Sequence, residues 1–224
     1  MDQSILMRYA VYFCPAEGSG LDAFGRDWLA TEHIPGIDPP DLRTLLTDVR
    51  RYGWHATLRS PFELAEAVSY QDLRETVAAV ARQATSFTLP LKLDRLAGFL
   101  ALRPCGDESA INALAERCVR ALNALRAPLS EAAQRRRATG LDEHELHLLH
   151  EFGYPYVLQR YRFHLTLSAP ASASEERVLC TWLSPKLATL PPAQIDALTI
   201  CCESEPGKDF EMLERIPLGG GHLA

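Results

Sequence analysis

Apolar and polar positions alternate over several short stretches of the chain, and this pattern predicts half-buried β-strands. The stretch 87–96 (FTLPLKLDRL) alternates strictly, and its Pro90 lacks the N–H that a central strand would donate, so we expect an edge strand there. Gly98 separates it from 99–104, the expected hairpin partner. The other predicted strands lie at residues 5–14, 52–60 and 157–168, with a second hairpin formed by 195–204 and 210–218.

Apolar positions three or four residues apart predict helices elsewhere in the chain. A helix opened by Ser172 or Ser174 is expected after the second half's first strand. Residues 130–156 are more polar and predict two short helices that break at Thr139, whereas the prolines of 33–41 predict a loop. The remaining predicted helices are at 21–30, 70–85 and 108–126.

The order of these elements repeats and predicts an α+β fold. Strand, helix, strand, helix and strands in the first half are echoed by helix, strand, helix and strands in the second. We therefore expect a single bilobal domain over 1–224 with a pseudo-twofold axis, each lobe an antiparallel sheet with helices on its outer face. The approximate lobes are 5–105 and 106–217, and 218–224 is expected to be a flexible tail.

One short motif occurs twice, as WHATLR and as FHLTLS, 109 positions apart. Successive side chains of a strand point to opposite faces, so His55, Thr57 and Arg59 are predicted to share one face. The same spacing places Arg162, His164 and Thr166 on one face of the second strand. If the two faces meet, two imidazoles and two hydroxyls line a common cleft.

Such a cleft suits in-line displacement at phosphorus. One neutral imidazole can take a proton from the attacking water or hydroxyl while the other, protonated, delivers a proton to the leaving oxygen. The Thr57 and Thr166 hydroxyls can donate to the non-bridging oxygens. This chemistry requires no metal and no cofactor, and the sequence does not decide which histidine is the base.

The paired HATL and HLTL segments resemble the two-histidine (2H) phosphoesterase superfamily, whose signature is two H-x-[ST] motifs. The segments RYAVYF, RYGWHATLRSPF, GFLALRP, GYPYV and YRFHLTL are similar to its bacterial branch of phosphonate metabolism proteins of unknown function, over about residues 8–170. The resemblance implies a bilobal fold around a metal-free site, cyclic phosphodiester or related phosphoester chemistry on nucleotide- or sugar-like substrates, and catalytic roles for His55, Thr57, His164 and Thr166.

Further side chains are candidates for binding the substrate. Arg8 and Tyr12 share a face of the first strand and reach the cleft if that strand borders the His55 strand. Tyr154 and Tyr156 directly precede the second motif and could stack on a base or cap a sugar, although turn packing explains them as well. With Arg59 and Arg162 these residues complete the predicted site.

The bulk composition narrows the class of partner. A net charge of −6 argues against a duplex-DNA partner, and no apolar run reaches membrane-spanning length, while single-stranded RNA ends stay a less favoured possibility. Six cysteines without a C-x-x-C pair predict neither a zinc knuckle nor a disulfide framework. The start of the chain lacks the pattern of a signal peptide, so the cytoplasm is the expected location.

Two charged runs invite other interpretations. His144, His147 and His150 are spaced i, i+3, i+6, whereas a metalloprotease helix carries two histidines at i and i+4, so a solvated helix face is favoured over a zinc site. The run 135–137 of three arginines could be a phosphate-binding patch, but three charges on a short helix favour a solvated face.

The sequence therefore predicts a metal-independent phosphoesterase that hydrolyses a small cyclic phosphodiester, a nucleoside or ribose cyclic phosphate. The resemblance implies a role in phosphonate breakdown. Two alternatives stay open. One is RNA end processing or 2'-5' ligation, and the other is a non-catalytic module that binds a nucleotide or phosphosugar.

Overall fold

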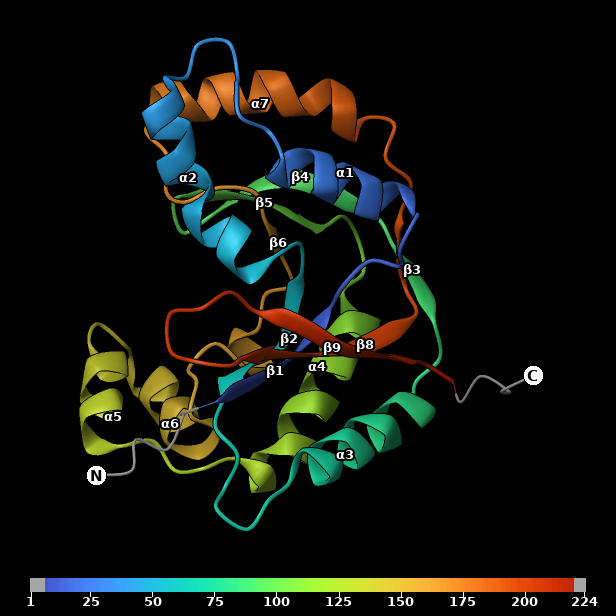
Figure 1. The fold of residues 1–224 in the computed structure, drawn as a ribbon, viewed down its shortest axis with the longest axis vertical. Helices are drawn as coiled ribbons and strands as arrows, with labels where there is room; N and C mark the ends of the chain where they lie inside the picture. The colour runs from blue at the N-terminus through green and yellow to red at the C-terminus, as the bar shows by residue number, and fades with distance from the viewer. Residues whose placement is uncertain (1–6, 220–224) are drawn as a thin grey trace.

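A computed structural model describes residues 7–219 of the chain, and its centre is a seven-stranded antiparallel sheet (Figure 1). The strands lie in the order β4-β5-β6-β2-β1-β8-β9, and β3 and β7 pair in a small separate sheet. Their bounds are β1 Arg8–Phe13, β2 Ala56–Phe62, β3 Phe87–Leu89, β4 Leu91–Leu96, β5 Phe99–Pro104, β6 Leu165–Thr166, β7 Ala193–Ile195, β8 Ala197–Glu203 and β9 Glu211–Pro217.

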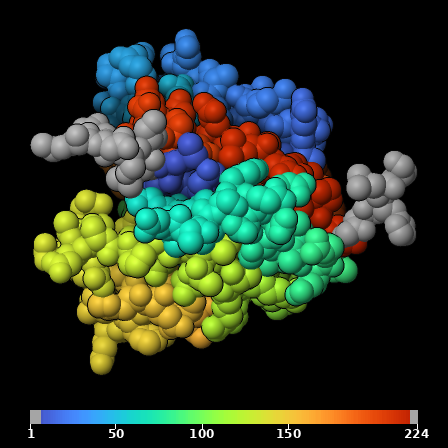
Figure 2. Space-filling view, turned by 60° about the horizontal axis from the view of Figure 1, so that its bottom comes forward, coloured from blue at the N-terminus to red at the C-terminus, as the bar shows by residue number. Residues whose placement is uncertain are grey.

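Helices gather at the two ends of this sheet. In Figure 1, α1, α2 and α7 lie together beside β4 and β5, while α3 and α4 cover the part built from β1, β2, β8 and β9. In Figure 2 the turquoise α3 segment lies at the surface between the red β8–β9 hairpin and the yellow-green segment of α4. The bounds are α1 Gly20–Leu29, α2 Pro39–Tyr52, α3 Tyr70–Arg82, α4 Ser109–Leu122, α5 Glu131–Ala138, α6 Glu143–Phe152 and α7 Ala173–Leu187.

The predicted α+β class with antiparallel sheets is confirmed, as are most of the predicted elements. The strand 87–96 is interrupted at Pro90, and β4 lies at the edge of the large sheet as expected. The last helix begins after Ser172, whose hydroxyl accepts from the Glu175 N–H in a capping box. The short helices α5 and α6 occur where the polar stretch predicts them.

One helix was not predicted. The segment 33–41 was expected to be a loop leading into the first motif, but α2 begins at Pro39 and continues to Tyr52. Proline is favoured in the first turn of a helix, where no intrahelical N–H bond is needed. The helix then buries an apolar stripe made of Leu42, Leu45, Leu46 and Val49.

The second motif strand is shorter than predicted. Instead of 157–168, only Leu165–Thr166 are paired, and the preceding segment makes a 3₁₀ turn at Leu158–Arg160 (η2). Leu158 has φ +51°, a left-handed conformation that no strand accommodates. The expected extended run therefore begins only after this turn.

Strands from the two predicted lobes alternate in the large sheet. β6 lies between β5 and β2, and β8 pairs with β1, so the sheet is not split at residue 105. The lobes 5–105 and 106–217 stay a prediction as a division of the chain. Most of the predicted tail 218–224 lies outside the described residues; within them, Leu218 is buried and its N–H donates to the carbonyl of Asp196.

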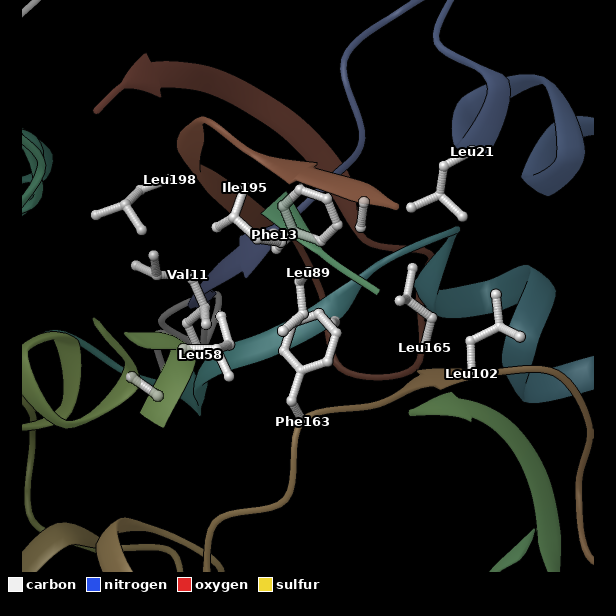
Figure 3. Close-up of a cluster of buried hydrophobic side chains, with 14 of the residues drawn as sticks. Val11, Phe13, Leu21, Leu58, Leu89, Leu102, Phe163, Leu165, Ile195 and Leu198 are labelled. Carbon is white, nitrogen blue, oxygen red and sulfur yellow. The ribbon is translucent and has the colours of Figure 1, made fainter. Parts of the chain in front are cut away.

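The core lies on one side of the sheet, between it and the helices. Alternate residues of β1, β2 and β6 enter it, among them Val11, Leu58 and Leu165, and Figure 3 shows these side chains converging with those of other strands. Phe163 joins this cluster from the residue before the second histidine. The opposite side of these strands is therefore free to carry polar side chains.

Trp54 anchors the start of β2 against α1. Its indole N–H donates to the carbonyl of Leu21 at 3.0 Å, and its ring lies where a side chain at Gly25 would be. A Cβ at Gly25 would lie 2.1 Å from Trp54 Cδ1. The glycine thus permits the close approach that holds the residue before His55 in place.

Gly25→Ala is expected to lower the free energy of unfolding by up to about 2 kcal/mol, because an overlap cost of about 1–3 kcal/mol opposes a helix propensity gain of about 1 kcal/mol. Urea unfolding of both proteins measures the change. The same substitution in a Trp54→Ala background should instead stabilise the protein slightly. Equal effects in the two backgrounds would show that the indole is not the obstacle.

Candidate active site

The two motifs meet because β2 and β6 are antiparallel neighbours. Ala56 pairs with Leu165, and both side chains are fully buried in the core. In this register His55 lies across from Thr166, and Thr57 lies across from His164, on the other face of the two strands. The pairing produces a local twofold arrangement in which each histidine faces the other motif's threonine.

Two further contacts hold this strand pair. Beyond Thr57, β2 has no partner in β6, and the Tyr161 hydroxyl donates to the Thr57 carbonyl at 2.9 Å in its place. On the other side, the indole N–H of Trp28 donates to the carbonyl of Leu167 at 2.9 Å. The short strand β6 is therefore fixed by side chains where its ladder ends.

Both histidines are oriented by the same local hydrogen bond. His55 Nδ1 lies 3.0 Å from the carbonyl oxygen of Gly53, and His164 Nδ1 lies 2.7 Å from that of Arg162. A carbonyl oxygen can only accept, so Nδ1 carries the proton in each ring. The Nε2 atom of His55 lies 3.5 Å from the Thr57 hydroxyl, and that of His164 makes no hydrogen bond among residues 7–219.

Burial shifts the titration of both imidazoles. It lowers the pKa of His55 to about 4; the hydrogen bond to Gly53 opposes this shift and the nearby His164 adds to it. Burial also lowers the pKa of His164, against the effect of the Arg162 carbonyl and with a contribution from Arg103. Both rings are therefore neutral near pH 7 in the free protein.

A pocket of about 450 Å³ opens over these side chains. Its floor is the polar face of β1, β2 and β6, and its walls come from the end of α2 and from residues 137–156. Eight of the ten predicted site residues line it: Arg8, Tyr12, His55, Thr57, Tyr154, Tyr156, His164 and Thr166. Both motifs thus line one pocket.

Tyr12 supports the His55 ring. The two rings are stacked, with centroids 4.0 Å apart and planes inclined by 29°. Burial raises the pKa of the Tyr12 phenol above its ordinary value, so Tyr12 stays a neutral hydrogen-bond donor. Its cross-strand partner is Thr57, which confirms that the first strand borders the His55 strand.

Arg59 does not extend the row of His55 and Thr57, and that prediction is wrong. The pairing of β1 with β2 is irregular here: Tyr12 pairs with Thr57, but the next residue, Val11, pairs with Arg59. A β-bulge of this kind breaks the alternation of faces. Arg59 is consequently buried at 1% exposure and lines a neighbouring pocket.

Arg162 also lies outside the pocket over the histidines. Its guanidinium donates to the carbonyl oxygens of Gln159 and Tyr161, and the side chain lines an adjoining apolar pocket that shares Thr57 and His164 with the first. Arg162 precedes the paired residues of β6, but burial still alternates from Tyr161 to Leu167, so Arg162 stays on the same side of the chain as His164.

Sequence reasoning missed several wall residues. Tyr52 ends α2, the helix that was not predicted, and its ring lies 6.2 Å from that of His55. Arg137 belongs to a run interpreted as a solvated face, yet it lines the pocket and donates to the Gly153 carbonyl at 2.7 Å. Ser60, Thr139 and Leu141 also line the pocket. A helical pattern in 39–52 was the available signal for Tyr52.

The histidine run 144–150 forms no metal centre among residues 7–219. No group of three or more His, Cys, Asp or Glu side chains is placed there to hold an ion. His147 instead pairs with Glu151, and His150 contacts Gln134. Within the same residues, no helix combines the length and the apolar character needed to cross a bilayer.

Comparison with known families places the chain. Residues 57–211 match the model of a family described as a protein of unknown function, DUF1045. The chain belongs to this family. The match covers Thr57, the whole second motif and most of the pocket walls. The paired motifs that carry the resemblance to the two-histidine phosphoesterases meet in one pocket of this DUF1045 protein.

Curated relatives carry one name. A protein of Janthinobacterium sp. (strain Marseille) named ribose 1,5-bisphosphate phosphokinase PhnN is 37% identical over 235 residues, covering 96% of this chain and 51% of the relative. A protein of Laribacter hongkongensis (strain HLHK9) with the same name is 37% identical over 220 residues, covering 94% and 52%. The DUF1045 chain thus spans about half the length of these relatives.

Solved structures with a similar fold include the E. coli protein LigT. Its complex with NADP+ is 16% identical, with a TM-score of 0.48, and the match covers 96% of this chain and 99% of LigT. Its complex with phosphate is 15% identical with a TM-score of 0.45 over 96% and 99% of the two chains.

The depressed pKa of His55 predicts a pH-dependent stability. Between about pH 6.5 and pH 4 the unfolded chain binds a proton at His55 that the folded chain does not, so stability present above pH 6.5 is lost as the pH falls, by up to about 3 kcal/mol. Urea unfolding of the wild type and of His55→Gln should show the wild type losing more stability over this range. Parallel losses in both proteins would contradict the depressed pKa.

Proposed function

We propose that this protein is a phosphoesterase that hydrolyses a small cyclic phosphodiester by acid–base catalysis. The observation that carries the proposal is the facing pair of His-x-Thr strands, whose two histidines are each held through Nδ1 and line one pocket. A ribose or nucleoside cyclic phosphate is of the size that a cavity of about 450 Å³ accepts.

His55 is proposed as the general base. With its pKa at about 4, its Nε2 carries a lone pair at neutral pH, and Tyr12 and the Gly53 carbonyl fix the ring. Water attacks phosphorus as Nε2 of His55 takes its proton. The protonated imidazole of His55 then lies beside the phosphate, and its positive charge stabilises the negative charge that builds up there.

His164 is proposed as the general acid. An anionic phosphodiester in the pocket raises the pKa of a neighbouring imidazole, which offsets the effect of burial on His164. Protonated Nε2 then donates to the leaving oxygen as the P–O bond breaks, giving one hydroxyl and one phosphomonoester. Thr57 and Thr166 donate to the non-bridging oxygens, where charge accumulates.

Sugar phosphates are the proposed substrate class, within phosphonate breakdown. The name of the two curated relatives refers to ribose 1,5-bisphosphate, a sugar phosphate. The sequence resemblance to phosphonate metabolism proteins supports phosphonate breakdown as the pathway. Because this chain spans only about half of those relatives, their kinase activity is not carried over to it.

The first test is hydrolysis of nucleoside 2',3'-cyclic phosphates and ribose 1,2-cyclic phosphate in the presence of EDTA. Activity should follow a bell-shaped pH profile, and His55→Ala and His164→Ala should each lower kcat by about 10²- to 10⁴-fold, since each removes one proton-transfer group. Product analysis by phosphorus NMR measures the outcome.

His33→Ala is the matched control, because His33 is exposed and lines none of the pockets described around the motifs. Its activity should equal that of the wild type. Full activity in either motif variant would overturn the mechanism. Binding of a cyclic nucleotide in calorimetry without any product would favour a binding module over an enzyme.

A further inference from the structure

A second polar pocket adjoins the pocket that contains the two histidines. Its volume is about 550 Å³, and it lies between the end of β2, the start of α5 and the end of α6. Arg8, Ser60, Pro61 and Arg137 line both pockets, so the two are continuous at their border. The proposed chemistry at the histidines does not use this second pocket.

Cationic side chains dominate the second pocket. Its lining contains one carboxylate, that of Glu63, and five guanidinium groups, those of Arg8, Arg59, Arg126, Arg136 and Arg137. Arg8 pairs with Glu203, but the other four make no ion pair with any carboxylate in residues 7–219. A protein with a net charge of −6 thus concentrates unpaired positive charge in one hollow.

Burial of the Arg59 side chain makes this unpaired positive charge unfavourable for the stability of the fold. The side chain is buried, and its Nε has no hydrogen-bond partner within the described part of the chain. Burial, and then Arg126 and Arg137, lower the pKa of Arg59 to about 10. A buried cation with cations for neighbours is destabilising unless an anion occupies the same place.

A purely structural role for these arginines does not account for their charge. Arg59 donates twice to the Phe152 carbonyl and Arg137 donates to that of Gly153, so both cover the C-terminal end of α6. A helix end presents about half a negative charge, which is far less than four guanidinium groups carry. Most of the positive charge in the pocket is therefore left without a protein partner.

Gly153 leaves room for the guanidinium group of Arg126 at the end of α6. A Cβ there would lie 3.0 Å from the Arg126 Cζ and Nε atoms, so the glycine lets the guanidinium pack against the end of α6. Arg126 then donates once, to the Ala127 carbonyl at 2.9 Å, and its Nε has no partner in residues 7–219. The Nη2 group of Arg126 makes no hydrogen bond within these residues, and it is the donor left for a ligand.

We propose that the second pocket binds a phosphomonoester at the far end of the same substrate whose cyclic diester lies between the histidines. This inference rests on the proposed function. Guanidinium groups bind phosphate through two parallel hydrogen bonds, and a dianion matches several arginines better than a single carboxylate does. The four shared lining residues place both anionic groups of one small molecule within one continuous cavity.

The kinetic test compares adenosine 2',3'-cyclic phosphate with the same compound bearing a 5'-phosphate. The wild type should show a KM about tenfold or more lower for the 5'-phosphorylated compound, the effect of a charge-assisted hydrogen bond. Arg126→Gln and Arg136→Gln should each bring the two KM values together by raising that of the phosphorylated compound. Equal KM values in the wild type would overturn the proposal.

The two arginine variants differ in how much each could disturb the fold. Arg126 is half-buried and contacts the backbone, whereas Arg136 is exposed, so Arg136→Gln leaves the fold undisturbed. Arg135→Gln is the matched control, because Arg135 is on the same helix, pairs with Glu131 and does not line either pocket. The control should keep the wild-type ratio of KM values. A loss of the ratio in Arg135→Gln as well would assign the effect to general charge and overturn the site.

Calorimetry with ribose 5-phosphate separates this proposal from the proposed function. Binding that persists in His55→Ala/His164→Ala but weakens about tenfold or more in Arg136→Gln supports the second site, even if no cyclic diester is hydrolysed. Hydrolysis at the histidines without arginine-dependent binding supports the enzyme and overturns the second site. Preference for an RNA oligomer ending in a 2',3'-cyclic phosphate over the phosphorylated mononucleotide would also overturn it.

Discussion

The pairing of Ala56 with Leu165 is the constraint on which the site depends. Because both residues enter the core, the four residues beside them must face the opposite side, and the antiparallel register sets each histidine across from the other motif's threonine. A slip of one residue in either strand would bury an imidazole and expose a leucine or alanine. The cost of exposing that apolar surface therefore keeps the reactive groups in place.

The pocket combines neutral and positively charged side chains, which serve different purposes. Burial favours neutral imidazoles, which can exchange protons, while the guanidinium group of Arg137 at the border with the second pocket attracts anions. Neutral and cationic groups coexist because Tyr12 packs against the ring of His55 on the sheet, whereas Arg136 and Arg137 come from α5. The arrangement suits a substrate whose negative charge extends beyond the reacting phosphate.

The repeated motif predicted the reactive face because strand alternation is a local property of the chain. It failed at Arg59, where a bulge in β2 depends on the pairing with β1 and has no signature in the motif itself. The strand predicted at 157–168 is wrong before Tyr161, because a left-handed Leu158 and a 3₁₀ turn replace its first part. The helix Pro39–Tyr52 was missed because its opening prolines resemble a loop, and with it the contribution of Tyr52 was missed.

The two halves of the site differ in how firmly they are built. The histidines and threonines come from a sheet with a packed core on its other face, and their geometry is set by backbone pairing. The pocket wall comes from residues 137–156, which pack through few apolar side chains and are tied to the sheet by polar contacts such as Arg59 to the Phe152 carbonyl. Substitutions in that wall can change which substrate fits without altering the register that aligns the imidazoles. Chemistry is thus fixed by the strands, and substrate choice is left to the helical segment between the motifs.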